Sequence, residues 1–200
     1  MIVIGIDLAG VEKRGSGFCI MRGLTAETRL LYSDEEIISE VLLTGSEVVA
    51  IDAPLSLPVG RCCLEDTCSC RNKNHFRFCD LELRKMSIKF FPITIGPMRL
   101  LTKRGIGLKK TLEDQGIKIL ETYPGAAQDL WKIPRKRDLK GLRFGLKKLG
   151  VKGQINKPGL TDHELDAISC ALVGRLYILK KYIAIGDEKE GLMFLPKTLL

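Results

Sequence analysis

Two short apolar runs in this chain each end in an aspartate, and this pattern constrains the fold more than any other feature. Ile4-Gly5-Ile6 leads to Asp7, and Val48-Val49-Ala50-Ile51 leads to Asp52. Unbroken apolar runs of this length are typical of strands buried inside a sheet. The carboxyl ends of such strands lie at the edge where open α/β sheets bind their ligands. We therefore expect Asp7 and Asp52 to lie at one functional edge of an α/β sheet.

A third acidic segment, residues 162–167, opens the best-marked helix of the sequence. Glu164 stands three residues after a threonine, which is the spacing of a capping box, and apolar residues follow at helical intervals. Asp162, His163 and Asp166 fall within one turn and border one region of the helix surface. Asp162 also has the simpler interpretation of a first-turn acid favoured by the helix dipole, and Glu164 that of a capping partner. We assign a functional role to Asp166 and leave His163 open on these grounds.

The order of elements between the first two acids favours one topology. The patterns of three strands, a helix and a fourth strand occupy residues 2–8, 15–21, 25–32, 33–45 and 47–51. The three strands form an antiparallel meander, because turn residues separate them. Ser33 and Glu36 have capping-box spacing at the start of the helix, and Gly45 ends it. The fourth strand is then expected to pair beside the first.

The chain is expected to leave the sheet after Asp52. Two prolines within residues 53–58 cannot continue a central strand. An insertion at about residues 54–116 is therefore predicted. It contains a cysteine-rich loop from residue 62 to 70, a helix near residues 78–86 and a basic helix from residue 97 to about 115.

A fifth strand is predicted at residues 117–122, with Glu121 near its end. A short helix follows, with Pro124 in the first turn, where proline is favoured. The sequence thus predicts a single domain, residues 1–200, with a mixed five-stranded α/β sheet flanked by helices. A basic, cysteine-rich helical insertion follows the fourth strand.

The charge is distributed unevenly along the chain. The 200 residues carry a net charge of +8. Residues 61–157 hold 23 Lys plus Arg against 9 Asp plus Glu, a net charge of +14. The two flanking segments, which contain the candidate acids, therefore carry a net charge of −6. Basic residues neutralise phosphates and carboxylates hold cations, so this division suits a nucleic-acid partner, either DNA or RNA. The alternative is that the charge only keeps the protein in solution. The candidate contacts to nucleic acid are Lys103, Arg104, Lys109, Lys110, Arg135, Lys136 and Arg137.

Four segments together resemble a known family. Residues 4–10, 50–55, 121–127 and 162–167 are similar to a largely uncharacterised family described as predicted nucleases with a ribonuclease-H-like fold. The resemblance covers nearly the whole chain. It implies a ribonuclease-H-like sheet and a metal-dependent nuclease that hydrolyses phosphodiester bonds.

A more distant resemblance is to the Holliday-junction resolvases of the same superfamily. These carry an acid on the first strand, another on the fourth, and an acidic or His-containing pair before Asp-Ala on the last helix. By motif, Asp7, Asp52, His163 and Asp166 take these places. The resolvases commonly have Glu on the fourth strand, where this chain has the shorter Asp52.

The implied chemistry is hydrolysis assisted by Mg²⁺ or Mn²⁺. Three carboxylates supply the oxygen ligands that these ions prefer, and two ions about 4 Å apart would activate water and stabilise the leaving oxygen. Asp7 would bridge the ions, and His163 would bind metal or position water. The catalytic candidates are Asp7, Asp52, Asp166 and His163, the metal-ligand candidates are Asp7, Asp52, Asp166 and Asp162, and the supporting candidate is Glu121.

Five of the seven cysteines gather between residues 62 and 79. They are Cys62, Cys63, Cys68, Cys70 and Cys79. The spacing is not a clean pair of CxxC motifs, so structural zinc is one interpretation among three. Disulfides are the first interpretation. The chain has few Asn and Gln residues and abundant Lys and Glu, which favours a thermophilic source, and intracellular proteins of thermophiles can contain disulfides. Unpaired thiols are the third. Cys19 and Cys170 fall within strand and helix patterns and are expected to pack in the core.

Other classes are weighed against the nuclease. Actin-like ATPases place phosphate at a turn like Asp7-Leu8-Ala9-Gly10, but they need two such domains, and this chain has room for one. A non-catalytic nucleic-acid-binding protein would show the same basic middle. No apolar run approaches the roughly 18 residues of a membrane span, so we expect a cytoplasmic protein without membrane contact. The sequence does not decide the oligomeric state, and a homodimer is one of the states that it allows.

Overall fold

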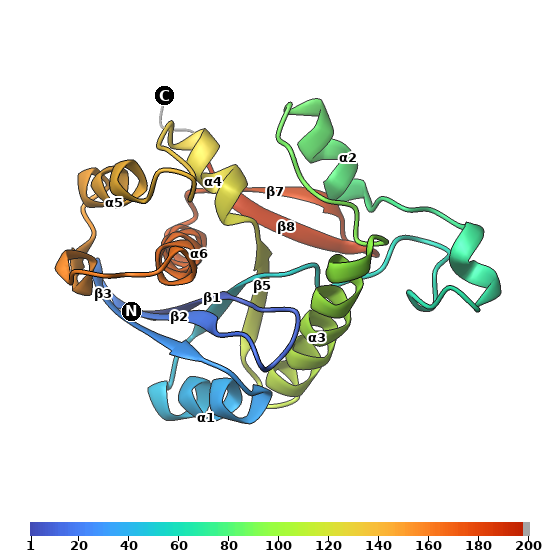
Figure 1. Ribbon diagram of the computed structural model, residues 1–200, viewed down its shortest axis with the longest axis horizontal. Helices are drawn as coiled ribbons and strands as arrows, with labels where there is room; N and C mark the ends of the chain where they lie inside the picture. Colours follow the sequence, from blue (N-terminus) through green and yellow to red (C-terminus); the bar gives the residue numbers. More distant parts are fainter. Residues whose placement is uncertain (198–200) are drawn as a thin grey trace.

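A computed structural model describes residues 1–197, and it is an α/β fold built on one mixed sheet (Figure 1). The described residues form eight strands in the order β6-β3-β2-β1-β4-β5-β8-β7. The strands are β1 (Ile2–Asp7), β2 (Ser16–Arg22), β3 (Thr25–Leu31), β4 (Val48–Asp52), β5 (Lys118–Thr122), β6 (Lys152–Gly153), β7 (Tyr182–Asp187) and β8 (Gly191–Pro196). The prediction of five strands was therefore incomplete, although its five strands are the adjacent ones β3-β2-β1-β4-β5.

The first half of the sheet follows the sequence pattern closely. β1, β2 and β3 form the antiparallel meander, and β4 pairs parallel to β1. Helix α1 (Asp34–Thr44) lies between them, with the capping box of Ser33 and Glu36 formed and Gly45 in the left-handed conformation at its end. β5 then pairs parallel to β4. The carboxyl ends of β1, β4 and β5 consequently lie at one edge.

Helices cover both faces of the sheet. α1 and α3 (Gly96–Glu113) pack on one face, where their apolar residues join those of β1 and β4 in one core cluster. On the other face lie α6 (Asp162–Ile178), α5 (Leu139–Lys148) and α4 (Pro124–Leu130), and α6, which is seen nearly end-on in Figure 1, packs against β1, β2 and β4. α3 was expected inside the insertion, but Leu108 and Leu112 are buried against β1 and β4. It belongs to the central core.

The remaining part of the insertion holds the short helix η1 (Ser69–Asn72) and α2 (Phe78–Lys85). The loop with η1 projects from the body of the molecule (Figure 1). α2 packs against the β7–β8 hairpin through Cys79 and Leu83, which lie in a cluster with Met193 and Leu195. This hairpin is the main element that the sequence reasoning missed, together with α5, β6 and η2 (Gln154–Asn156).

No helix within the first 197 residues is both long enough and apolar enough to cross a membrane.

Candidate active site

Asp7 and Asp52 lie side by side at the ends of two paired strands. The parallel register of β1 and β4 pairs Asp7 directly with Asp52. Side chains of directly paired residues point to the same face of a sheet, and alternation places both on the face covered by α6. The apolar residues just before them, Ile6 and Ile51, point to the opposite face and anchor the strands in the core with α1 and α3. The predicted juxtaposition of the two aspartates is therefore present.

α6 approaches the sheet unusually closely and delivers two more candidates. A Cβ on Gly5 would lie 2.1 Å from the carbonyl oxygen of Ala167, and a Cβ on Gly17 would lie 2.0 Å from that of His163. Only glycine permits this backbone contact. As a result, His163 Nδ1 lies 2.6 Å from Asp7 Oδ2, and Asp166 is buried beside the same strands.

Two further polar side chains complete the surroundings of Asp166. Gln128 of α4 is buried and donates a hydrogen bond of 2.7 Å from Nε2 to Asp166 Oδ1. Lys136 approaches from the segment between α4 and α5, and its Nζ lies 3.4 Å from Asp166 Oδ2. The sequence reasoning missed Gln128 and assigned Lys136 to nucleic acid. Neither contact leaves a local pattern in the sequence, because both depend on where α4 lies against α6.

The carboxylates strongly affect one another, and we refer to Asp7, Asp52 and Asp166 as the acid cluster. Burial, followed by repulsion from Asp7 and Asp166, raises the pKa of Asp52 well above its usual value. Burial, and then Asp7, also raises the pKa of Asp166. The hydrogen bond to Asp7 raises the pKa of His163. Burial opposes the charge of Lys136, but the three carboxylates outweigh it and raise the pKa of that amine.

The acid cluster is suited to hard divalent cations. It offers carboxylate oxygens, the ligands that Mg²⁺ and Mn²⁺ prefer. Its carboxylates are not gathered around one point, since within residues 1–197 only a group of cysteines places three or more ligand atoms all within 4.8 Å of one another. Asp162 opens α6 and is partly exposed beside His163, outside the cavity that the cluster borders.

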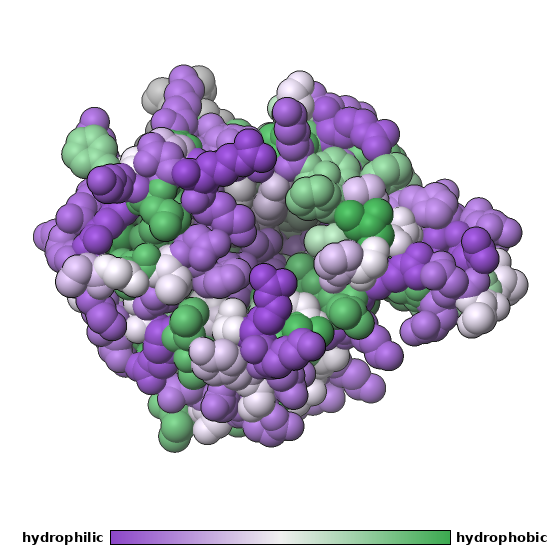
Figure 2. Space-filling view, in the orientation of Figure 1, coloured by the Kyte–Doolittle hydropathy of each residue, from purple (hydrophilic) through white to green (hydrophobic). Residues whose placement is uncertain are grey.

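A cavity of about 410 Å³ opens directly over the acid cluster, and we call it the acidic cavity. Asp7, Asp52, His163 and Lys136 border one side of it. The other side is apolar and contains Phe90, Phe91, Ile93, Met98 and Leu101. Figure 2 shows the molecule hollowed near the centre of this face, with hydrophobic side chains gathered on one rim of the hollow. A substrate group in this cavity would contact both the acids and an apolar wall.

Glu121 borders the same cavity but has a different role from the acid cluster. Its register partner is Ile51, so its side chain points to the face opposite Asp52. There Glu121 Oε2 accepts hydrogen bonds from Arg77 Nη1 at 2.8 Å and from the Leu55 amide at 2.7 Å. Arg77 is buried and also pairs with Asp80, so the three side chains form a buried ion network at the wall of the cavity. It fixes the chain that leaves β4, and the support of the acid cluster by Glu121 stays a prediction.

The predicted nucleic-acid contacts separate into three groups. Arg104 is structural, because it binds Asp34 and the carbonyl oxygens of Ala9 and Tyr32. Lys103, Lys109 and Lys110 lie on α3 and line neither the acidic cavity nor the cavity next to it. Arg135, Lys136 and Arg137 do line that neighbouring cavity, of about 1010 Å³, which we call the basic groove.

Arg135 has internal partners as well, since it pairs with Asp129 and donates a hydrogen bond of 3.0 Å to the hydroxyl of Tyr123. The sequence reasoning missed the two cations Arg84 and Lys89 and the aromatic residues that line the same groove. The sequence did contain an indication of this groove, because Phe and basic residues are clustered between positions 76 and 91.

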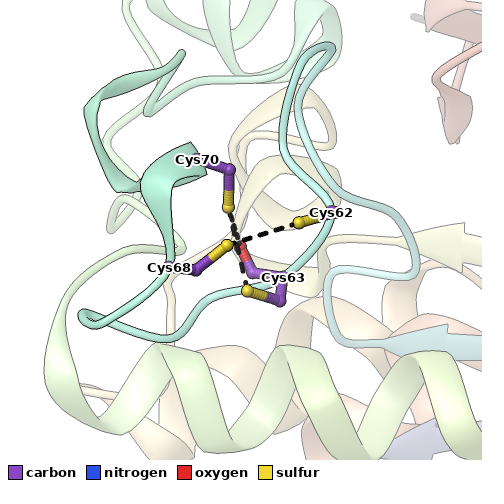
Figure 3. A group of neighbouring side chains, drawn as sticks. All are labelled: Cys62, Cys63, Cys68 and Cys70. Carbon is purple, nitrogen blue, oxygen red and sulfur yellow. Dashed lines mark hydrogen bonds between the residues drawn. The ribbon is translucent and has the colours of Figure 1, made fainter.

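Four of the five clustered cysteines meet in space. The sulfurs of Cys62, Cys63, Cys68 and Cys70 all lie within 4.8 Å of one another (Figure 3). Each has a free thiol, which disagrees with the first-ranked expectation of disulfides. Cys79 is separate and buried against the β7–β8 hairpin. Cys19 and Cys170 are buried in the core, as predicted.

Comparison with known proteins finds a similarity at the level of structure. No family model and no curated protein sequence matches this chain. Among solved structures, RuvC from Thermus thermophilus is similar over 90% of this chain and 96% of its own length, with 13% identity and a TM-score of 0.48.

Proposed function

We propose that this protein is a nuclease that hydrolyses phosphodiester bonds with the help of Mg²⁺ or Mn²⁺, on a ribonuclease-H-like sheet. One observation carries the proposal. Three carboxylates from three separate elements, Asp7 of β1, Asp52 of β4 and Asp166 of α6, lie close enough to repel one another at the carboxyl edge of the sheet. Asp7 and Asp52 also line the acidic cavity. The strand order β3-β2-β1-β4-β5 agrees with the β-β-β-α-β core expected for such a fold.

The roles of individual residues follow from their partners. The acid cluster would hold the ions, which supply Lewis-acid activation of water and stabilise the leaving oxygen. His163 uses Nδ1 for Asp7, so exchange of a proton with substrate falls to its Nε2. Gln128 fixes the orientation of Asp166. Lys136 now pairs with Asp166, and its ammonium group would pair with a substrate phosphate instead when substrate binds.

The alternative is a nucleic-acid-binding protein without catalysis. One observation favours it: the ammonium group of Lys136 already neutralises part of the acid cluster, as a structural ion pair would. The two functions differ in whether divalent ions are needed, so metal dependence distinguishes them.

The test is cleavage of labelled single-stranded, duplex, hybrid and branched substrates with Mg²⁺ or Mn²⁺. Wild-type protein should cleave at least one of them, and Asp7→Asn, Asp52→Asn and Asp166→Asn should each lower the rate by orders of magnitude while the fold is kept. Asp114→Asn, at the exposed end of α3, is the matched control and should retain the wild-type rate. Cleavage that persists in all three variants, or no cleavage of any substrate, would contradict the proposal.

A further inference from the structure

We propose that Cys62, Cys63, Cys68 and Cys70 bind one structural zinc ion. Cys62 and Cys63 lie on the outgoing arm of the projecting loop, and Cys68 and Cys70 on its return, with the four sulfurs turned toward a common centre (Figure 3). Zinc takes four thiolate ligands in a tetrahedron, which is the donor set that this arrangement offers.

The distances between sulfurs match that geometry. Cys62 Sγ lies 3.5 Å from Cys68 Sγ, and Cys63 Sγ lies 3.7 Å from Cys70 Sγ. In a tetrahedron with Zn–S bonds of about 2.3 Å, neighbouring sulfurs are about 3.8 Å apart. A disulfide would require about 2.05 Å. His75 is not part of the group, because its ring lies against Arg61 and Thr94.

The loop also needs a crosslink. From residue 59 to 75 only Cys70 is buried, so the segment has no apolar core of its own. Segments of this kind are held by metals or disulfides because burial cannot offset the entropy of ordering them.

The zinc loop braces a wall of the acidic cavity. Arg99 of α3 pairs with Asp66 in the loop, with Nη2 at 2.7 Å from Oδ1. Cys62 and Cys63 line a further cavity together with Arg99 and Leu100 of the same helix. The adjacent residues Met98 and Leu101 belong to the apolar wall over the acid cluster. Zinc in this loop would therefore fix the first turns of α3.

Metal analysis of the whole protein tests the site. Protein purified with zinc should carry one Zn²⁺ per chain, and Co²⁺ in its place should give the visible absorption bands of a tetrahedral thiolate complex. Cys68→Ser should lose the ion, whereas Cys79→Ser, a buried cysteine outside the loop, should keep it.

Wild-type protein alone also decides the question, should Cys68→Ser fail to fold. The four loop thiols should resist alkylation until a chelator removes the zinc. A mass that is lower by about 2 Da per cysteine pair without reductant would reveal disulfides. If protein purified without zinc is then given zinc and its loop thiols still alkylate at once, the cysteines are free. Either result would overturn the proposal.

A second and independent set of contacts concerns the substrate, and it rests on the proposed function. We infer that the acidic cavity and the basic groove together accept an unpaired nucleic-acid strand. The two hollows share Phe90, Phe91, Tyr123 and Lys136, so they form one continuous path past the acid cluster. Phe91 is 70% exposed, although it is a large apolar side chain. Exposed aromatic rings beside cations are the means by which proteins bind unpaired bases.

The charges along the path complement a strand. Lys89, Arg84 and Arg137 line the basic groove, and the guanidinium of Arg84 lies 4.3 Å from the ring centre of Phe76. Phosphates would contact these cations while bases stack on Phe91. A base pair in a duplex hides its faces, so it could not use the apolar wall.

Binding without divalent ions tests this inference separately from catalysis. In EDTA, fluorescence anisotropy should show tighter binding of labelled oligothymidylate or oligouridylate than of a duplex of equal length. Phe91→Ala should weaken binding of the single strand by about tenfold, since stacking of one base contributes roughly 1–3 kcal/mol. Phe91→Tyr should preserve it.

Phe144→Ala is the matched control, because Phe144 is 60% exposed on α5 and lines neither hollow. Tighter binding of the duplex, or equal affinity of Phe91→Ala and wild type, would overturn the inference. Selective single-strand binding without cleavage in any metal would instead preserve it and overturn the nuclease.

Discussion

At the scale of single residues, Lys136 places a positive charge against three carboxylates. Its Nζ lies 3.4 Å from Asp166 Oδ2, and Asp7 and Asp52 also act on it. The three acids could be predicted because each follows a recognisable apolar strand or opens a capped helix. Lys136 could only be recognised as basic, because its position depends on packing between distant segments. The same is true of Gln128.

Asp52→Asn should stabilise the metal-free protein at neutral pH. The raised pKa of Asp52 means that the folded state binds a proton more tightly than the unfolded state. Stability therefore falls as the pH rises from 3.8, the ordinary pKa of an aspartate, through the raised pKa of the folded state, where the carboxylate becomes charged among its neighbours. Asn carries no charge, so thermal melting in EDTA should show a higher Tm at pH 7, by about 2–4 °C per kcal/mol relieved.

The difference between Asp52→Asn and wild type should shrink as the pH falls toward 3.8 and disappear well below it, where the carboxyl group is protonated in both states. Asp114→Asn should show no such pH dependence. A variant that melts below wild type at pH 7 in EDTA would show that the acid cluster is not under electrostatic strain.

Lys136→Met should increase the affinity for Mn²⁺. The ammonium group repels a cation at the acid cluster, and a unit charge a few ångströms away contributes roughly 1–4 kcal/mol, so the affinity should rise at least about fivefold. Isothermal titration calorimetry measures this directly. Lys89→Met, in the basic groove, is the control. Unchanged or weaker Mn²⁺ binding in Lys136→Met would indicate that Lys136 does not oppose a metal ion.

At the scale of elements, local patterns located the strands and helices that contain the acids. The capping boxes before α1 and α6 formed as predicted, and Glu164 is confirmed as a capping residue. The β7–β8 hairpin was missed because its strands are only partly buried and lack strict alternation. α5 did carry an indication, since Asp138 caps it and Leu142 and Leu146 recur at helical spacing. The close approach of α6 to the sheet could not be predicted from the sequence, because a glycine in a strand does not show which element packs against it.

Gly5→Ala should destabilise the protein and displace α6. The added Cβ would lie 2.1 Å from the carbonyl oxygen of Ala167 and 2.3 Å from the amide of Ala171, so the backbones must separate. Overpacking of this kind costs roughly 1–3 kcal/mol, and chemical denaturation should show it. Cleavage should fall as well, because His163 and Asp166 move with α6.

Gly107→Ala in α3 is a matched control, since its Cβ would meet nothing within 4 Å. Alanine is the better helix former, so this change should raise the free energy of unfolding by about 0.5–1 kcal/mol. Equal stability of Gly5→Ala and wild type would mean that α6 does not contact β1 as closely as described.

At the scale of the whole molecule, charge and shape act together. The net charge of +14 in residues 61–157 could be counted from the sequence. Which of these cations have internal partners and which line a groove could not be predicted. Part of this charge is neutralised by the acidic flank, as in the pair of Arg104 with Asp34, and part of it lines the basic groove. The cations in the groove are the ones that lie next to the acidic cavity.

Binding of single strands should weaken steeply with salt. About four phosphate contacts in the basic groove predict a slope of roughly −3 in a plot of log affinity against log salt. The double change Lys89→Ala with Arg137→Ala should reduce the slope by about 1.4. The double change Lys140→Ala with Lys147→Ala, on exposed positions of α5, should leave it unchanged. A flat salt response in the wild type would exclude phosphate binding there.

Anomalous diffraction from crystals soaked in Mn²⁺ tests most directly whether the acid cluster binds divalent ions. If Asp7, Asp52 and Asp166 serve metal-assisted hydrolysis, anomalous density should appear among their carboxylates, with Lys136 moved away from Asp166. Anomalous density at other sites alone, with Lys136 still paired to Asp166 at saturating Mn²⁺, would contradict the account.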